Sequence, residues 1–321
     1  MSNATIIVGD VRQRLNDLDA GSVRTCITSP PYWGLRDYGN DSQIGLEQTP
    51  QDYVRELVEV FAGVHRVLAD DGTLWLNLGD SYAGSGKARD SDGTHQAGGK
   101  QGTSLGTIIG NLNKTDGGVP AKNLIGIPWR VAFALQEFGW YLRQDIIWAK
   151  PNPMPESVTD RCTKSHEYLF LLSKSPKYFY DNEAIKEPGL HPGRMNGRVG
   201  GNKYQQEGSG LAPHSGVAKA YESRNKRDVW TIATEPFGGA HFAVMPTALV
   251  ELCILAGSER GDLVLDPFAG SGTVGVVALR HDRDFVGIEV NPEYAQLAHN
   301  RIFDDGPLMN TVDMKTEQVL L

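Results

Sequence analysis

The feature that most constrains the fold is a strand, turn, helix and strand unit in the C-terminal part of the chain. Residues 263–265 predict a short buried strand, and residues 266–273, Asp-Pro-Phe-Ala-Gly-Ser-Gly-Thr, follow it as a glycine-rich turn. Residues 274–280 then predict a helix, and residues 285–288 predict a second strand that ends at Glu289. Two strands joined through a helix are typical of a parallel sheet, so the unit predicts an open α/β fold.

The turn of this unit has the properties of a ligand site. The free N–H groups and the dipole at a helix N-terminus attract an anion. Glu289, at the end of the next strand, is suited to holding a ribose diol through its two acceptor oxygens. The turn also contains a Gly-x-Gly-x-x-Gly spacing (Gly270, Gly272, Gly275), with an acid nineteen residues after the first glycine. A dinucleotide-dependent dehydrogenase is therefore an alternative at this point.

A second motif, Ser29-Pro30-Pro31-Tyr32, follows another predicted strand, residues 23–28. The two prolines hold the backbone stiffly and have no N–H, so the corner is rich in acceptors and poor in donors. Such a corner suits a substrate group that brings two hydrogens, such as an exocyclic NH2, and Tyr32 offers a flat face for a planar base. The alternative is a proline-rich turn that only closes a strand.

Taken together and in this order, the two motifs resemble those of the S-adenosylmethionine-dependent DNA amino-methyltransferases. The cofactor motif of that family reads Asp-Pro-Phe-x-Gly-Ser-Gly-Thr, and its catalytic motif is (Asp/Asn/Ser)-Pro-Pro-(Tyr/Phe). Here the catalytic motif comes more than two hundred residues before the cofactor motif. That order resembles the permuted beta group, which is common in restriction–modification systems and phages, and the resemblance covers roughly residues 5–303.

The resemblance implies an α/β, Rossmann-like class I methyltransferase fold. Its sheet would have seven strands, mostly parallel, with an antiparallel hairpin formed by residues 140–148 and 167–172. The motif order would be circularly permuted and a target-recognition region inserted. The implied domains are a catalytic core, residues 1–184 and 229–305, an insertion, residues 185–228, and a tail, residues 306–321.

The resemblance also implies the residues of the site. The catalytic residues would be Ser29, Pro30, Pro31 and Tyr32. The cofactor-binding residues would be Asp10, His241, Pro246, Asp266, Pro267, Phe268, Gly270, Ser271, Gly272, Thr273 and Glu289. Asp10 is equally well read as a helix cap. His241 and Pro246 match a His-Pro-Ala-x-Phe-Pro segment of the family, whereas Phe242 stands where the family has proline.

Each part of S-adenosylmethionine has an expected partner in these motifs. We expect the amide groups of residues 270–272 to take the carboxylate and Glu289 to hold the ribose diol. Asp266 would hold the ammonium, directly or through water, and Phe268 would pack near the adenosine or the sulfonium.

The charge distribution permits DNA as the substrate. The whole chain carries a net charge of −8, but residues 185–228 contain eight Lys and Arg against four acidic residues. An acidic body with a basic segment can still approach phosphates through one face. The expected DNA-binding residues are Lys150, Asn152, Arg194, Arg198, Arg224, Lys226 and Arg227. A solvated polar loop without a specific partner is the alternative for the insertion.

Residues 79–121 form a glycine-rich stretch in which the hydrophobic periodicity disappears. A loop of this length inside a compact domain is usually functional or disordered. It is either a surface insertion or a segment that becomes ordered when DNA binds, with Lys87, Arg89 and Lys100 on phosphates.

The expected chemistry is methyl transfer to an exocyclic amine of a flipped base. The Ser29 hydroxyl and the Pro30 carbonyl would each accept one N–H hydrogen and aim the nitrogen lone pair at the methyl group. Tyr32 would stack on the extruded base. Serine at position 29 resembles the N4-cytosine enzymes, and a neutral acceptor suits cytosine, whose O2 a carboxylate would repel. N6-adenine is the second choice.

Other activities fit the sequence less well. Protein-glutamine methyltransferases place a similar Pro-Pro-Tyr beside an amide, but their cofactor motif comes first. A dehydrogenase is not expected to contain Asp266-Pro267-Phe268 or the Ser29 corner. An inactive, purely DNA-binding relative is disfavoured because both motifs are intact.

The cysteine spacing and the lengths of the apolar runs indicate the compartment in which the protein works. Cys26, Cys162 and Cys253 lie far apart without a Cys-x-x-Cys spacing, so we expect neither a disulfide framework nor a metal site. No apolar run approaches transmembrane length and no signal peptide is present. We therefore expect a cytoplasmic monomer or homodimer that acts on double-stranded DNA. A cognate restriction endonuclease acting separately is a candidate partner.

Overall fold

The structure, a computed structural model, describes residues 2–35, 40, 42–83, 119–189, 222–235, 244–307 and 310–316. The chain forms two units. The main unit comprises Met1–Tyr180 and Asp228–Leu321, and the small unit comprises Asp181–Arg227. The predicted target-recognition insertion, residues 185–228, nearly coincides with the small unit, and its role stays a prediction.

The main unit is built on a mixed sheet in which nine strands occur among the described residues. Their spatial order is β11-β1-β10-β9-β2-β3-β5-β4-β8. The strands are β1 (Ser2–Val8), β2 (Val23–Thr28), β3 (Leu68–Leu78), β4 (Tyr141–Ala149), β5 (His166–Ser173), β8 (Val229–Thr231), β9 (Leu263–Asp266), β10 (Asp284–Glu289) and β11 (Asn310–Lys315). Strand β5 pairs antiparallel with both of its neighbours, and all the other pairs in this sheet are parallel. The predicted α/β class with a mostly parallel sheet and an antiparallel hairpin is therefore confirmed.

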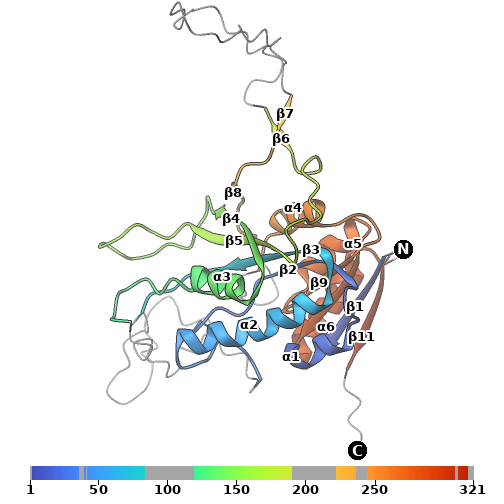
Figure 1. Ribbon diagram of the computed structural model, residues 1–321, viewed down its shortest axis with the longest axis horizontal. Helices are drawn as coiled ribbons and strands as arrows, with labels where there is room; N and C mark the ends of the chain where they lie inside the picture. The colour runs from blue at the N-terminus through green and yellow to red at the C-terminus, as the bar shows by residue number, and fades with distance from the viewer. Residues whose placement is uncertain are drawn as a thin grey trace, which may run out of the picture. The chain divides into compact units, whose positions relative to one another are not determined.

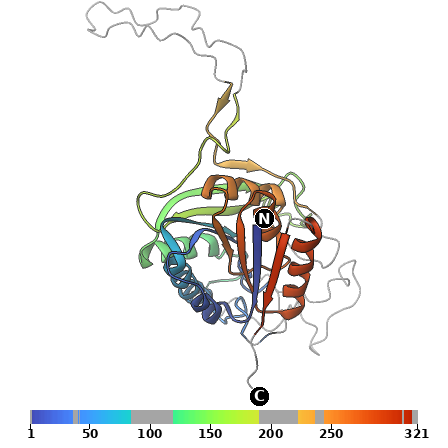
Figure 2. The same cartoon turned by 90° about the vertical axis from the view of Figure 1, so that its right-hand side faces the viewer.

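Helices cover both faces of this sheet (Figures 1 and 2). On one face lie α1 (Val11–Arg14), α2 (Pro50–Val67) and α3 (Ile127–Phe138), and on the other lie α4 (Thr247–Gly257), α5 (Thr273–Arg280) and α6 (Pro292–Asp305). A sheet covered on both faces needs apolar side chains on both. In β2 the neighbouring residues Cys26 and Ile27, which face opposite sides of the sheet, are both fully buried.

Helix α2 forms where its sequence pattern predicts it. The hydroxyl of Thr49 caps the helix by accepting a 3.1 Å hydrogen bond from the Asp52 N–H, and Pro50 stands in the first turn. Its buried side chains repeat at spacings of three and four, as an amphipathic helix requires: Tyr53, Leu57, Val60, Phe61, Val64 and Val67.

Three details go beyond what the local patterns indicate. The Asp-Asp-Gly run at residues 70–72 is typical of a turn, yet it lies inside β3, in an irregular stretch between Leu68 and Thr73, which pair with Val23 and Thr25 of β2. The tail, residues 306–321, supplies β11, which pairs in parallel with β1. Strands β8 and β11 extend the predicted seven strands to nine by adding an edge strand at each side. Of the predicted loop 79–121, residues 84–118 lie outside the described residues.

The small unit contains a short antiparallel pair, β6 (Glu187–Pro188) with β7 (Ser223–Arg224). Its charged residues are paired with one another: Nε of Arg224 and Nε of Arg227 lie 2.7 Å and 2.6 Å from the same Oε1 of Glu187. One carboxylate, that of Glu187, thus pairs with two of the arginines expected to bind DNA.

Candidate active site

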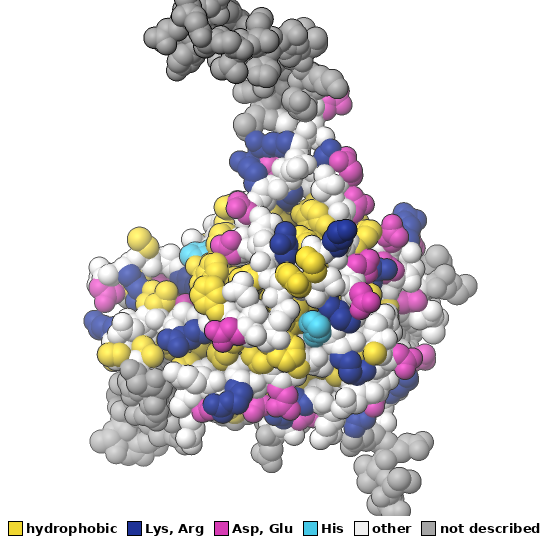
Figure 3. All heavy atoms as spheres, in the orientation of Figure 1, with side chains coloured by type: hydrophobic (Ala, Val, Ile, Leu, Met, Phe, Trp, Pro, Cys, Tyr) yellow, Lys and Arg dark blue, Asp and Glu magenta, His cyan; other side chains and the backbone are white. Residues whose placement is uncertain are grey.

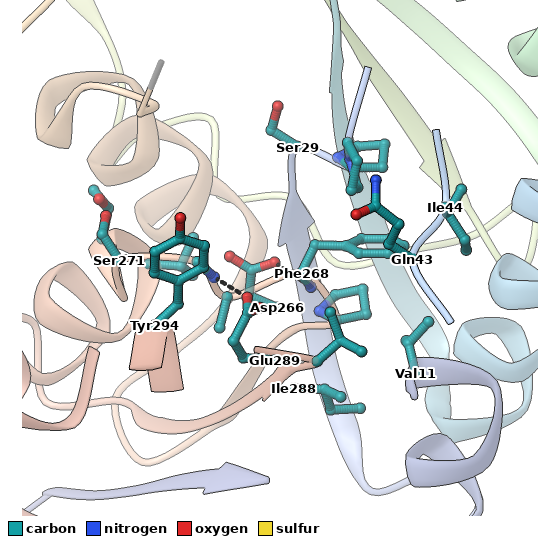
Figure 4. Close-up of a pocket in the computed structure, with 18 of the residues that line it drawn as sticks. Val11, Ser29, Gln43, Ile44, Asp266, Phe268, Ser271, Ile288, Glu289 and Tyr294 are labelled. Carbon is teal, nitrogen blue, oxygen red and sulfur yellow. Dashed lines mark hydrogen bonds between the residues drawn. The ribbon is translucent and has the colours of Figure 1, made fainter. Parts of the chain in front are cut away.

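A cavity of about 1230 Å³, counting its open mouth, lies at the carboxyl ends of β1, β2, β9 and β10 (Figure 4). Ligands of open α/β sheets bind at this edge. The cavity is lined by both motifs, which are more than two hundred residues apart in the chain. The predicted residues that line it are Asp10, Ser29, Pro30, Pro31, Tyr32, Asp266, Pro267, Phe268, Gly270, Ser271, Thr273 and Glu289.

The Ser29–Tyr32 corner follows β2 directly, and its carbonyl groups are used unequally. The carbonyl of Pro31 accepts a 2.9 Å hydrogen bond from the Tyr53 hydroxyl. For the carbonyl of Pro30, in contrast, there is no hydrogen-bond donor among the described residues. The corner therefore offers the Ser29 hydroxyl and the Pro30 carbonyl as acceptors.

Asp266 ends β9 and is nearly inaccessible, with 3% of its surface exposed. Its Oδ1 accepts hydrogen bonds from the Thr28 hydroxyl, at 2.6 Å, and from the Phe268 N–H, at 3.0 Å. Within the described part of the chain its Oδ2 accepts none. Burial raises the pKa of Asp266 to about 7 in spite of these two bonds, and the nearby Glu289 carboxylate adds to the rise. A cation in the cavity would favour the ionised form of this carboxyl.

Glu289 ends β10 and is held by the backbone on both of its oxygens. The Gly270 N–H donates to Oε2 at 2.8 Å, and the Asn291 N–H donates to Oε1 at 2.9 Å. Burial raises the pKa of Glu289, while these two hydrogen bonds oppose the rise. Asp266 and Glu289 thus place two buried carboxyl groups in one cavity (Figure 4). Their acceptor oxygens suit a cationic ligand that also carries hydroxyl groups.

The glycine turn is shaped by close packing against α6. Gly272 precedes α5 with a φ of +76°, and a Cβ atom there would lie 2.9 Å from the Cβ of Ala298. The Gly272 N–H donates to the Ala269 carbonyl at 2.8 Å. Since the Gly270 N–H is engaged by Glu289, two of the three amides expected to receive a carboxylate already have partners. Ser271 supplies the third N–H, for which no acceptor lies among the described residues.

Asp10 is the N-cap of α1, as one of its two readings predicts, and its role towards the cofactor stays a prediction. It lines the cavity, and its carboxylate caps α1 by accepting from the Arg12 N–H at 2.9 Å. The Arg12 guanidinium also contacts this carboxylate, with Nη2 2.5 Å from Oδ2. Burial alone would raise the pKa of Asp10, but the hydrogen bonds from Arg12 outweigh it and the pKa is lowered. Asp10 is therefore a charged acceptor at the rim of the cavity.

Two predicted cofactor residues are missing from this lining, and a third, His241, lies outside the described residues. Gly272 and Pro246 are absent from the lining and precede α5 and α4, respectively, as N-cap residues.

The cavity also has walls that sequence reasoning missed: Gln43, Ile44, Met245, Tyr294 and Leu297. Tyr294 could have been found, because it follows Glu289 within the first turn of a helix capped by Asn291. Gln43 and Ile44 lie in a loop without periodicity, so no sequence signal identifies them.

The expected DNA contacts are distributed over both units. Lys150 forms an ion pair with Glu167, and its Nζ lies 4.2 Å from the centre of the Trp148 ring. The amide of Asn152 exchanges two hydrogen bonds with the backbone of Thr234. Both side chains are therefore engaged within the main unit. Arg224, Lys226 and Arg227 belong to the small unit, while Arg194 and Arg198 lie outside the described residues.

Surface charge is mixed in the view of Figure 3, where acidic and basic side chains alternate over the visible face. Among the described residues there is no group of three or more His, Cys, Asp or Glu arranged to hold a metal ion. A search of the same residues for a helix long and apolar enough to cross a membrane finds none.

Comparison with known proteins places the chain in a family. Residues 23–300 match the model of the N6/N4 methyltransferase family, described as DNA methylase. The chain is 50% identical to the Type II methyltransferase M.SmaI of Serratia marcescens, over 94% of this chain and 91% of that protein. It is 48% identical to M.Cfr9I of Citrobacter freundii, over 94% and 88%.

Solved structures show the same fold at lower identity. One is TTHA0409 of Thermus thermophilus, a putative DNA modification methylase complexed with S-adenosyl-L-methionine. It matches with a TM-score of 0.60 and 22% identity, covering 98% of this chain and 99% of that one. The PvuII cytosine-N4-specific DNA methyltransferase matches with a TM-score of 0.62 and 20% identity, covering 98% and 95%.

These matches confirm the expected resemblance, the fold class and S-adenosylmethionine as the methyl donor of the family. They also fit the cavity, where the two motifs of a methyltransferase meet. The chain belongs to the N6/N4 DNA methylase family and is a DNA methyltransferase.

Proposed function

We propose that this chain transfers a methyl group from S-adenosylmethionine to the exocyclic N4 of cytosine in double-stranded DNA. The observation that carries the proposal is the position of Ser29. A neutral hydroxyl, rather than a carboxylate, stands at the acceptor corner and lines the same cavity as Asp266 and Glu289.

The cavity has acceptor groups that match the cationic and hydroxyl groups of the cofactor. S-adenosylmethionine supplies an activated methyl group on a sulfonium, and it also carries an ammonium, a carboxylate and a ribose diol. Asp266 has an oxygen without a partner among the described residues, which suits the ammonium, and Glu289 is oriented as a fixed acceptor for the diol. Phe268 adds a flat apolar wall to the same cavity.

The acceptor corner explains how a weak nucleophile could react. The lone pair of a cytosine amine is delocalised into the ring. The Ser29 hydroxyl and the Pro30 carbonyl can each accept one hydrogen of that amine and draw the nitrogen towards tetrahedral geometry. The nitrogen lone pair is then aimed at the methyl group, and positioning rather than a strong base supplies the rate.

The choice of cytosine rests on the charge at this corner. An aspartate at position 29 would repel the O2 acceptor of a cytosine ring, whereas a serine hydroxyl does not. The base must leave the double helix to reach the cavity, so the proposal includes base flipping. We assign target recognition to the small unit, because it nearly coincides with the insertion to which the family resemblance gives this role. Its Arg224, Lys226 and Arg227 carry positive charge that can hold phosphates and so position the unit on DNA.

The relatives suggest the biological setting. Several of them are named Type II methyltransferases, and the first two are about half identical to this chain over nearly their full length. We infer that this protein modifies a specific site that a separate restriction endonuclease would otherwise cut.

Nucleoside analysis tests the proposal. The protein is expressed in cells that lack their own DNA methyltransferases, and digested DNA is examined by mass spectrometry. We expect N4-methylcytosine with the wild type and none with Ser29→Ala, which keeps the cofactor site intact. N6-methyladenine in its place would refute the base assignment, and the absence of both modified nucleosides would refute the activity.

A further inference from the structure

A chain of hydrogen bonds leads from the acceptor corner into the sheet. The Ser29 hydroxyl lies 3.4 Å from the Tyr32 hydroxyl, and the Tyr32 hydroxyl donates to Oε2 of Glu167 at 2.7 Å. Glu167 belongs to β5, far from both motifs in the sequence. It lies behind Tyr32 and does not line the cavity.

The Glu167 carboxylate, at the inner end of this series of hydrogen bonds, is held in place by two neighbours. Glu167 forms an ion pair through Oε1 with Lys150, which follows the C-terminal end of β4, and the two side chains are only 14% and 16% exposed. Asn77 of β3 donates from its amide to Oε2 of Glu167 at 3.2 Å and to the Tyr168 carbonyl at 3.1 Å. An ionised carboxylate has no proton to donate, so every contact of Glu167 is that of an acceptor.

This fixed acceptor determines the direction of the hydrogen bond made by Tyr32. Burial raises the pKa of the Tyr32 phenol, and the neighbouring Glu167 raises it further, so the phenol keeps its proton. The carbonyl oxygen of Asn77 lies 3.3 Å from the same hydroxyl and is also an acceptor. Both inner neighbours thus require the Tyr32 proton.

The direction of the second bond follows from the first. With its proton directed to Glu167, the Tyr32 oxygen can only accept from Ser29. The Ser29 proton is then engaged by the Tyr32 oxygen, and the lone pairs of the Ser29 oxygen remain for a donor in the cavity. An amine that brings two hydrogens needs such an acceptor.

We propose that Glu167 is a positioning residue that, acting through Tyr32, keeps the Ser29 hydroxyl oriented as an acceptor. The inference rests on the proposed function, because orientation of Ser29 matters only if an N–H group is presented to it. Reversing the direction of these hydrogen bonds would turn the Ser29 proton towards the amine and oppose the approach of the amine. A glutamine at position 167 permits that reversal, because its amide can donate to Tyr32.

The test compares Glu167→Gln, Tyr32→Phe and the double variant in single-turnover methyl transfer to DNA with saturating S-adenosylmethionine. We expect each single variant to lower the rate by about tenfold or more, with a cofactor Kd within about twofold of the wild type. Because Glu167 acts through the Tyr32 hydroxyl, the double variant should be no slower than the slower single variant. Asp305→Asn is the matched control. It also removes a carboxylate from an ion pair, the pair with Arg280 between α6 and α5, and neither residue lines the cavity.

Each other result overturns the inference. An unchanged rate in Glu167→Gln would show that the direction of the bond is unimportant. Losses that multiply in the double variant, or a loss confined to cofactor affinity, would show a role that bypasses Tyr32. If Glu167→Gln does not fold, as judged by thermal unfolding, an unchanged rate in Tyr32→Phe alone decides against the inference. A wild type that methylates no DNA would refute the proposed function as well, whereas a failure limited to the variants leaves that function standing.

Discussion

The Thr28 hydroxyl donates a 2.6 Å hydrogen bond to Oδ1 of Asp266, although 238 residues separate them in the chain. Thr28 ends β2, from which the Ser29 corner follows, and Asp266 ends β9, from which the glycine turn follows. The two strands are parallel neighbours, with Cys26 opposite Leu265. This bond therefore joins the acceptor corner to the cofactor turn at the floor of one cavity.

Cofactor affinity should depend on pH through Asp266. The pKa of this carboxyl is about 7 in the free protein, so it is largely protonated at pH 6 and ionised at pH 8. A ligand ammonium binds the ionised form, and affinity should therefore rise as the pH increases towards 7 and then level off. Calorimetry from pH 5.5 to 7.5 avoids the range in which an α-amino group itself loses its proton. A Kd that stays constant over this range would show that Asp266 does not contact the cation.

Asp266→Asn should stabilise the free protein at high pH while weakening cofactor binding. Because the pKa of Asp266 is raised on folding, the folded state favours the protonated form, and its stability falls as the pH rises from about 4 through 7. A rise in pKa from the ordinary 3.8 to about 7 corresponds to about 4 kcal/mol at most. Asparagine carries no such cost and can still accept from Thr28 and the Phe268 N–H.

Thermal unfolding of the free proteins at pH 8 and pH 4.5 provides this measurement. The Asn variant should gain stability over the wild type at pH 8 and show a much smaller gain at pH 4.5. An equal gain at both values would point to packing rather than charge as the cause.

Thr28→Val should move the pH dependence of cofactor binding upward. Valine has nearly the shape of threonine but cannot donate to Asp266, and this bond is one of two that stabilise the ionised carboxylate. The pKa of Asp266 should therefore rise further, and the Kd should increase more at pH 5.5 than at pH 7.5. The same calorimetric series measures both values, and parallel curves for the two proteins would exclude the effect.

Glu187→Gln should strengthen DNA binding. In the small unit this carboxylate is shared by Arg224 and Arg227, and its loss leaves both guanidiniums more available to phosphates. We expect a Kd several-fold lower at low salt and a steeper fall of affinity with salt, because each phosphate contact adds about 0.9 to the slope. Fluorescence anisotropy across a salt series measures this. Glu222→Gln is the matched control, since it removes the same charge from the same unit. Equal effects in the two variants would indicate net charge alone.

Much of the fold could be predicted because the local patterns agree with the tertiary structure. Strand β2, helix α2 and the unit from β9 to β10 occur where periodicity and caps place them. The Asp-Asp-Gly run at residues 70–72 is typical of a turn, and yet it lies within β3. Leu68 and Thr73 on either side of it pair with β2, so the strand continues across this local preference.

The site was only partly predictable. Two motifs identified the acceptor corner and the glycine turn of the lining, because a proline corner and a glycine turn are backbone requirements that leave a clear sequence pattern. Gln43 and Ile44 reach the cavity from an irregular loop, and Glu167 reaches Tyr32 from the start of β5. Their positions depend on strand order and register, which no local pattern encodes.

The sequence by itself determined the chemistry at each strand end: a donor-poor corner at Ser29–Tyr32, and acidic residues at positions 266 and 289 around a glycine turn. Only the tertiary structure decided that these ends meet, because adjacency of β2 and β9 is a property of the folded sheet. It also decided the charge states, since a carboxyl such as Asp266 changes its pKa through burial, and burial exists only after folding.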